Sequence, residues 1–184
     1  MTEQLKEIGR RLSALRDIAE MTAEGFCEKT GITTQELSAY EKGELDFSFS
    51  FLYNAARILG VDVVDLMSGE SPHLSEWCIV RSGEGYDIDR RAAYKYSHLA
   101  FTFQKKMAEP FLVTVEANKD VPTKHTHNGQ EFVWMVSGCM KFYIADAEYT
   151  LESGDSVYFN AAKPHAMQAL GDDTAQFLAV VIGQ

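Results

Sequence analysis

The spacing of apolar residues changes near residue 70, and this change constrains the fold more than any other feature of the sequence. Before that point apolar residues recur every three or four positions, as on the buried face of a helix. After it they form short alternating runs separated by Gly, Asn and Asp, as in strands. A chain of 184 residues is long enough for two small cores. We therefore expect a helical domain over 1–68, a connector leading into the next domain over 69–95, and an all-β domain over 96–184.

The helical part divides into four or five expected helices. The apolar stripe of the first, about 18 residues long, consists of Leu5, Ile8, Leu12, Leu15 and Ile18. Thr22 is typical of a residue that caps a second helix, and Gly31 suits the tight turn that follows it. A third helix is expected from Thr33 to Gly43, a fourth ends at Gly60, and a short fifth closes the domain.

The second part reads as a series of short strands from His98 onward. Eight are expected, at 98–104, 111–117, 130–136, 139–145, 147–151, 155–159, 165–170 and 175–182. Short strands with turns at regular intervals are typical of antiparallel sandwiches and jelly rolls. The second domain is therefore expected to be one of these.

Cysteine spacing and hydropathy indicate the cellular compartment. The three cysteines, Cys27, Cys78 and Cys139, are odd in number and widely spaced, so we expect reduced core residues rather than disulfides. The N-terminus lacks the apolar run of a secretory signal, and no stretch reaches the roughly 18 apolar residues that span a bilayer. We expect a cytoplasmic protein without a membrane partner.

The strongest chemical signal is a cluster of histidines around a glutamate. Residues two apart in a strand point to the same face, so His125 and His127 are expected to project together, and Glu131 to return to that face after a turn. His165 follows on a later strand, eleven residues after Gly154, as a candidate third imidazole. Imidazole and carboxylate ligands suit a borderline divalent ion. The expected cofactor is one transition metal, such as Zn, Fe, Mn or Ni.

The same residues resemble a known family. HxH, three residues, Glu, six residues and Gly, followed by Gly154 and His165, resemble the two motifs of the cupin superfamily. The resemblance implies a double-stranded β-helix, or jelly-roll, barrel. It further implies that His125, His127, Glu131 and His165 are the four protein ligands of one metal. One or two open positions would then admit water, a small ligand or dioxygen.

Alternation along the strands suggests the lining of a ligand pocket. Val133 and Met135 share the parity of the glutamate and are expected to point inward, whereas Trp134 faces outward. Tyr143 and Tyr158 are further pocket candidates, although aromatic strand residues are more often ordinary core.

Residues 8–66 resemble the helix-turn-helix domain of phage repressors and the XRE family, a lambda-repressor-like unit. The segments IGRRLSALRDIAEMT, FCEKTGITTQELSAYEKGE and FLYNAARILGVDVVDLM match its helices in order. The resemblance implies that the third helix enters the DNA major groove. The residues nearest the DNA would be Thr33, Thr34, Gln35, Ser38 and Ala39. The cations available for phosphates are Arg10, Arg11, Lys29 and Lys42.

Charge opposes this reading of the first domain. Residues 1–70 hold seven Lys and Arg against thirteen Asp and Glu, a net charge of −6, and the whole chain carries −10. Phosphate neutralisation supplies most non-specific DNA affinity, so few cations must be well aimed. The alternative is a helical unit that serves dimerisation only.

Together the two halves resemble single-chain XRE-cupin transcriptional regulators. The resemblance implies a homodimer that binds double-stranded DNA at an inverted repeat and responds to a small-molecule effector bound in the cupin domain. The alternative is a mononuclear non-haem iron cupin enzyme carrying a helix-turn-helix domain, as in an iron-dependent epoxidase. No separate acid–base pair outside the expected ligands marks a reaction, so the regulator is preferred. A third alternative is a metal-storing or sugar-binding scaffold.

Overall fold

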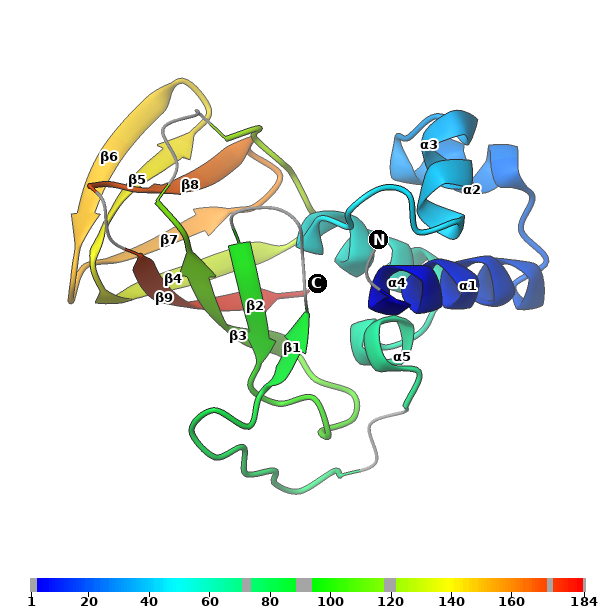
Figure 1. Cartoon of the computed structure of the whole chain (residues 1–184), viewed down its shortest axis with the longest axis horizontal. Coiled ribbons are helices and arrows are strands. Elements are labelled where there is room, and N and C mark those ends of the chain that lie inside the picture. The colour runs from blue at the N-terminus through cyan, green and yellow to red at the C-terminus, as the bar shows by residue number, and fades with distance from the viewer. Residues whose placement is uncertain (1–2, 71–73, 89–93, 118–121, 172–173, 184) are drawn as a thin grey trace. The chain divides into compact units, whose positions relative to one another are not determined.

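The structure is a computed structural model that describes residues 3–70, 74–88, 94–117, 122–171 and 174–183. The chain forms two compact units, Met1–Ser75 and Glu76–Gln184. Helices make up the first unit and strands the second (Figure 1). The change in apolar spacing near residue 70 therefore marks a change in secondary structure.

Five helices form the described part of the first unit, as the apolar spacing predicts. They are α1 (Glu3–Ile18), α2 (Ala23–Thr30), α3 (Thr34–Glu41), α4 (Phe49–Leu59) and α5 (Val63–Ser68). None of the described helices is long and apolar enough to cross a bilayer.

The expected signals at the helix ends are confirmed. Thr22 caps α2, and its side chain accepts a hydrogen bond from Gly25 N. Gly31 ends α2 in the left-handed conformation, with φ of 75°. Thr33 and Glu36 form a capping box at the start of α3, each side chain bonding to the other's backbone N–H. These local bonds fix where the two central helices begin and end.

The stripe on α1 is buried only at its N-terminal end. Leu5, Ile8 and Leu12 are fully buried, whereas Ile18 is 78% exposed. The stripe therefore ends about one turn earlier than expected. Gly9 lies on the same buried face, and a Cβ placed there would stand 2.5 Å from Tyr40 O at the end of α3. The α1–α3 contact is thus a close approach of two backbones, which sets the position of α3.

The strands of the second unit form two antiparallel sheets. The first has the order β1-β2-β3-β9-β4-β7, and the second β6-β5-β8. The strands are β1 (Tyr86–Ile88), β2 (Tyr94–His98), β3 (Ala108–Val115), β4 (Gln130–Ser137), β5 (Cys139–Ile144), β6 (Ala147–Glu152), β7 (Ser156–Asn160), β8 (His165–Ala169) and β9 (Ala175–Ile182). The six-stranded sheet and the smaller one appear in Figure 1 as the two walls of the unit. This arrangement confirms the expected antiparallel jelly-roll class.

The first expected strand is wrong. The structure has a strand up to His98 and a turn over residues 99–102, where 98–104 was expected to be extended. The imidazole of His98 explains the difference, because its Nδ1 accepts a hydrogen bond from Ala100 N (3.0 Å) and turns the chain away. His98 is itself buried, with Nε2 2.7 Å from Glu109 Oε2. Strand β1 lies within the range expected to be the connector.

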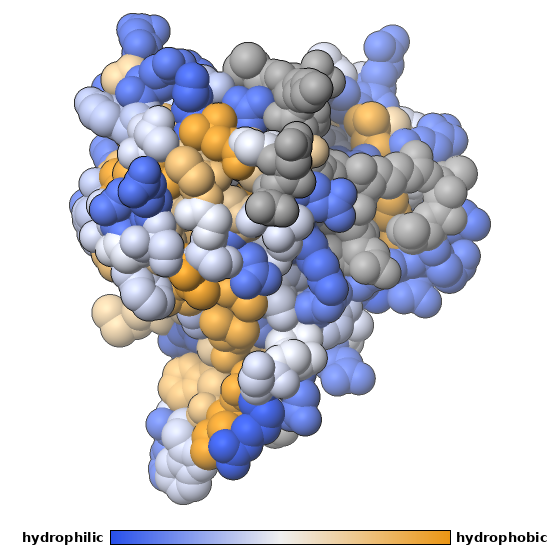
Figure 2. All heavy atoms as spheres, turned by 60° about the vertical axis from the view of Figure 1, so that its left-hand side comes forward, coloured by the Kyte–Doolittle hydropathy of each residue, from blue (hydrophilic) through white to orange (hydrophobic). Residues whose placement is uncertain are grey.

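Alternate side chains of the strands are buried and fill the space between the two sheets. Along β3 and β9 every second residue is buried, and along β4 Glu131, Val133 and Met135 are buried while Trp134 is exposed. The expected parity of β4 is confirmed. Apolar residues also reach the surface in groups, as the bands in Figure 2 show. The outer positions of β3 and β9 remain half-buried rather than exposed.

Candidate metal centre and nucleic-acid interface

Three buried side chains with metal-binding atoms meet inside the second unit. The ligand atoms of His127, Glu131 and His165 all lie within 4.8 Å of one another. His127 Nε2 is 3.0 Å from Glu131 Oε2, and His165 Nε2 is 3.7 Å from the same oxygen. The group forms the only such cluster of three or more His, Cys, Asp or Glu among the residues that the structure describes.

Three separate segments position these side chains. Glu131 lies on β4, between Phe159 of β7 and Val181 of β9. His127 precedes β4, and its backbone N donates to Ala161 O (3.0 Å). His165 begins β8 on the other sheet. The ligands therefore converge only because the two sheets pack face to face.

The turn between His127 and Glu131 depends on glycine. Gly129 has φ of 90°, and a Cβ there would lie 2.1 Å from Ile182 O. No other residue fits a positive φ together with so close a backbone. Gly129 thus lets the chain pass from the histidine to the strand that carries the carboxylate.

Backbone carbonyls orient both imidazoles. The Nδ1 of His127 lies 3.0 Å from Asn128 O, and the Nδ1 of His165 lies 2.8 Å from Lys163 O. Since a carbonyl only accepts, each Nδ1 carries a proton, so in the neutral ring the lone pair is on Nε2. Both Nε2 atoms face the Glu131 carboxylate, which also only accepts when ionised. Three acceptors without a shared proton suit a cation, so the residues fit a divalent metal.

Burial favours the metal-binding form of His165. It lowers the pKa of this imidazole, and the neighbouring His127 lowers it further, while the Glu131 charge and the Lys163 carbonyl act in the opposite direction. A lowered pKa keeps the ring neutral, as a metal ligand must be.

The fourth expected ligand, His125, lies apart from this group. Its side chain is exposed, and it is not among the clustered ligand atoms. Its backbone instead pairs with that of His165, through hydrogen bonds of 2.9 and 3.0 Å. The structure therefore brings together three of the four expected ligands. Two imidazoles and one carboxylate are the ligand set of facial triads, in which the remaining positions are open.

The expected pocket residues divide between the two faces of the sheets. Val133 and Met135 are fully buried on the same face as Glu131. Tyr158 is instead 56% exposed, and its hydroxyl donates to Gln130 Oε1 (2.6 Å) on the outer face. The reason is parity, because its neighbour Phe159 is the residue opposite Glu131.

Tyr143 also lies on an outer face. It alternates with the buried Phe142, and its hydroxyl donates to Gln168 Oε1 (2.7 Å) on β8. The ammonium groups of Lys124 and Lys141 each lie 5.9 Å from its ring centre. These lysines cover the ring, which explains why it is buried without lining the interior.

Phe159, one of the strand aromatics, lies against the cluster, and Phe142 packs against Phe159. The Phe159 ring is 4.9 Å from the His165 ring in an edge contact, and Phe142 is 5.0 Å from Phe159. These rings form part of the apolar surroundings of the cluster. The alternation that gave the parity of Val133 would have found Phe159 if the register of β7 against β4 had been known.

The candidate DNA-reading helix is α3. Thr34, Gln35 and Lys42 are exposed, whereas Ser38 and Ala39 are half-buried. The hydroxyl of Thr33 donates to Glu36 Oε2 (2.8 Å) within the capping box. Thr34 and Gln35 are therefore exposed base-reading candidates outside the capping-box bonds of Thr33.

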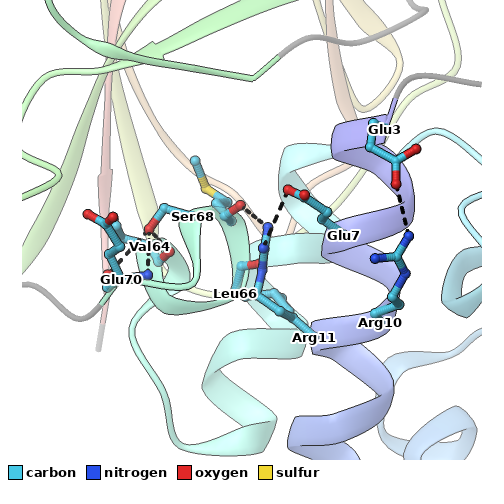
Figure 3. A network of polar contacts seen from close by, with 9 residues as sticks. Glu3, Glu7, Arg10, Arg11, Val64, Leu66, Ser68 and Glu70 are labelled. Atoms are coloured by element: carbon cyan, nitrogen blue, oxygen red, sulfur yellow. Dashed lines mark hydrogen bonds and ion pairs between the residues drawn. The ribbon is translucent and has the colours of Figure 1, made fainter.

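The four expected phosphate-contacting cations differ in availability. Arg11 points at the C-terminal end of α5, where its Nε donates to Leu66 O (2.9 Å) and its Nη2 to Met67 O (Figure 3). Its side chain is only 23% exposed, so Arg11 serves the packing of α1 against α5. Arg10 is exposed and pairs with Glu3 (2.9 Å). Lys29 and Lys42 are exposed.

A shallow pocket of about 390 Å³ lies between α1 and α3. Its lining consists of Arg10, Ser13, Ala14, Asp17, Ser38, Glu41 and Lys42. Glu41 is neutralised by Arg16, whose Nε lies 2.8 Å from its carboxylate. The raised pKa of Arg16 has this hydrogen bond as its largest cause. Arg10 and Lys42 therefore face a pocket whose acidic lining is partly compensated.

Comparison with known proteins agrees with this architecture. The family profile of a helix-turn-helix domain matches residues 7–90, and that of a cupin domain matches residues 111–181. No curated protein matches the chain.

Two solved structures are similar over nearly the whole chain. An HTH_3 family transcriptional regulator from Vibrio cholerae has 18% identity and a TM-score of 0.73, with 99% of this chain and 98% of that one covered. Hydroxypropylphosphonic acid epoxidase from S. wedmorenis has 23% identity and a TM-score of 0.53, with 98% and 100% covered. At such identities the similarity shows the fold.

These observations define the class of the protein. The chain is a helix-turn-helix protein with a C-terminal cupin domain. Its first unit is an XRE-like, lambda-repressor-like helical domain, and its second is a cupin barrel.

Proposed function

We propose that this protein is a sequence-specific DNA-binding regulator whose cupin domain holds one divalent metal and responds to a small molecule. The observation that carries the proposal is the presence, in one chain, of a helix-turn-helix domain with an exposed α3 and a barrel with a buried His-Glu-His cluster. Such a protein would act in the cytoplasm, beside the DNA that it binds.

DNA recognition would rest on α3. Gln35 has an amide that can bond to both N6 and N7 of adenine, and Thr34 has a hydroxyl suited to a base or a phosphate. Arg10, Lys29 and Lys42 would contact phosphates, whereas Arg11 would act by holding α1 against α5. Because few cations are available, the logarithm of the DNA affinity should fall only modestly with the logarithm of the salt concentration, with a slope of about one per phosphate contact.

Metal binding would rest on His127, Glu131 and His165. The two Nε2 lone pairs and the carboxylate oxygen would supply three ligand atoms in a buried site bordered by Phe159. A bound divalent ion would supply Lewis acidity and open positions for an oxygen ligand of the effector. The carbonyls of Asn128 and Lys163 would hold the imidazoles in place.

Regulation would require two copies. Helix-turn-helix dimers bind half-sites about 34 Å apart, so a small change in the posture of the domains alters the match to an inverted repeat. An effector that binds one posture more tightly than the other would shift the population toward it.

Selection from random duplex oligonucleotides tests the proposal. Purified full-length protein, loaded with metal or treated with chelator, is expected to enrich one palindromic sequence. Gln35→Ala should lose discrimination at one adenine position, at a cost of about 1–3 kcal/mol. Lys42→Ala should weaken binding to all sequences and lower the salt slope by about one. Lys124→Ala, a matched lysine change in the barrel, should alter neither. Enrichment of no sequence in either state would overturn the proposal.

The second candidate function is a mononuclear iron enzyme. It is favoured by the three-ligand set, which leaves more open positions than four ligands would, and by the fold shared with the epoxidase. The test is dioxygen consumption by the Fe(II)-loaded protein with hydroxypropylphosphonic acid as the probe. Turnover that Glu131→Gln abolishes would support the enzyme, and its absence together with selective DNA binding would support the regulator.

A further inference from the structure

The strand that carries His165 lies at the edge of the smaller sheet. β8 pairs with β5 along one side, and the order β6-β5-β8 leaves its other side outside the sheet (Figure 1). The backbone groups of His165 bond to those of His125 on that outer side. Since backbone groups of alternate residues point to the same edge of a strand, those of Met167 and Ala169 point there as well. The outer edge of β8 therefore presents three successive positions that need partners.

Different elements meet these three positions. Backbone segments meet the first and the third, as bridges from His125 and Ala117. At the second, the hydroxyl of Tyr94 donates to Met167 O and accepts from Met167 N (3.3 Å). A hydroxyl has one donor and can also accept, so it can bond to both backbone groups of one residue. The Tyr94 side chain thus takes the place that a neighbouring strand would have.

Tyr94 belongs to the other sheet. It begins β2 and pairs with Val115 of β3, within the six-stranded sheet. Its hydroxyl therefore links the six-stranded sheet to the smaller one. Met167 is buried, so losing this hydroxyl would leave an amide and a carbonyl away from water without this partner, which is unfavourable. The bond is a specific connection between the two sheets.

This connection lies two residues from His165. The Nε2 of His165 is 3.7 Å from Glu131 Oε2, and the two residues lie on different sheets, so their separation depends on how the sheets are held together. His127 instead reaches the same carboxylate from the segment that leads into β4. Divalent ions such as zinc bind nitrogen and oxygen ligands at about 2.0–2.2 Å. A shift of β8 by a few tenths of an ångström therefore changes how well His165 reaches an ion that Glu131 also binds.

We infer that Tyr94 is a positioning residue, whose hydroxyl holds β8 where His165 lies beside Glu131. The inference rests on the proposed metal-binding function and names a residue outside the ligand set that this function requires. Tyr94 acts through the backbone of Met167 and is not itself a ligand.

Tyr94→Phe tests the inference, because it removes the hydroxyl and keeps the ring. The matched control is Tyr143→Phe, whose lost hydroxyl bonds to a residue of the same strand, but to the side chain of Gln168 on the outer face (2.7 Å). Full-length protein is titrated with Co(II), whose visible absorption depends on the number and arrangement of its ligands. Tyr94→Phe should change the shape of the absorption band and weaken Co(II) binding about 10-fold, as changes beside metal ligands do. Tyr143→Phe should change neither. A wild-type spectrum and affinity for Tyr94→Phe would overturn the inference.

Amide hydrogen exchange of the metal-free chain is a second measurement. The Met167 amide should exchange slowly in the wild type and at least 10-fold faster in Tyr94→Phe, whereas the Ala166 amide, which points toward β5, should stay slow in both. Fast exchange of Met167 in the wild type, or an equal rate in the variant, would show that the hydroxyl does not hold β8.

The two proposals can fail separately. A wild type that binds Co(II) equally well without the Tyr94 hydroxyl would leave the metal site intact and overturn the role of Tyr94. A wild type that binds no Co(II) would overturn the metal site. The imidazole resonances of His165 in the metal-free protein then decide the role of Tyr94: a shift in Tyr94→Phe but not in Tyr143→Phe supports it, and unchanged resonances overturn it.

Discussion

Gly9→Ala tests the closest backbone contact in the helical unit. A methyl group on Gly9 would stand 2.5 Å from Tyr40 O and 2.6 Å from Glu41 O. Both are backbone atoms at the end of α3, so neither can swing aside as the end of a flexible side chain does. The methyl group therefore forces α1 and α3 apart.

The expected magnitude follows from two opposed terms. Alanine is favoured over glycine inside a helix by about 1 kcal/mol. Overpacking costs about 1–3 kcal/mol, and backbone contacts this short take the upper end of that range. We expect a net loss of about 2 kcal/mol in the free energy of unfolding of the helical unit. For a unit of this size that lowers its Tm by about 10 °C.

Circular dichroism at 222 nm measures the loss during heating, because the helices lie in the first unit. The matched control is Gly25→Ala in α2, where a Cβ meets only Thr22 Oγ1 at 3.3 Å. Its Tm should stay level or rise. Gly9→Ala should also weaken selective DNA binding, since α3 would shift. A Tm for Gly9→Ala equal to or above wild type would refute the close contact.

Three further predictions concern the ligands and Arg11. His127→Ala should lower metal affinity at least 10-fold while His125→Ala changes it little, as competition with a chromophoric chelator would show; the reverse order would contradict the three-ligand cluster. Arg11→Ala should cost about 1–3 kcal/mol in urea unfolding because it leaves carbonyls of α5 unpaired, whereas the exposed Arg10→Ala should cost under about 0.5 kcal/mol. Burial lowers the pKa of His165 below 6.5 in the folded, metal-free protein, so as the pH falls the unfolded chain takes up the proton before the folded one does. The free energy of unfolding should therefore be highest above pH 6.5 and decline as the pH falls below it. His165→Gln should flatten that decline in unfolding curves taken on either side of pH 6.5.

Much of the fold follows from local sequence. Thr22, Gly31 and Thr33 act on backbone groups within four residues, so helix ends could be predicted without knowing what packs against them. Alternation likewise gave the inward parity of Val133. The strand expected at 98–104 failed because an imidazole captures a nearby amide, and period alone does not report such a bond.

The candidate site was only partly predictable. The HxH and Glu spacing predicted His127 and Glu131, and the interval after Gly154 predicted His165, but the same spacing also predicted His125, which lies outside the cluster. Whether a side chain at that position turns inward depends on its pairing with the strand of His165, forty residues away in sequence. The bonds of Arg11 to α5 could not be predicted from local sequence either, since Leu66 and Met67 lie 55 and 56 residues away along the chain.

The sequence by itself determined where the chain changes from helices to strands, which residues end the helices, and which residue types are available to hold a metal. These depend on neighbours a few positions apart, whose interactions form in any context. Only the tertiary structure decided which imidazoles lie beside the carboxylate, which arginine bonds to another helix, and which side of each sheet is buried. These depend on strand register and on contacts between distant segments, which exist only once the two sheets and the five described helices have packed.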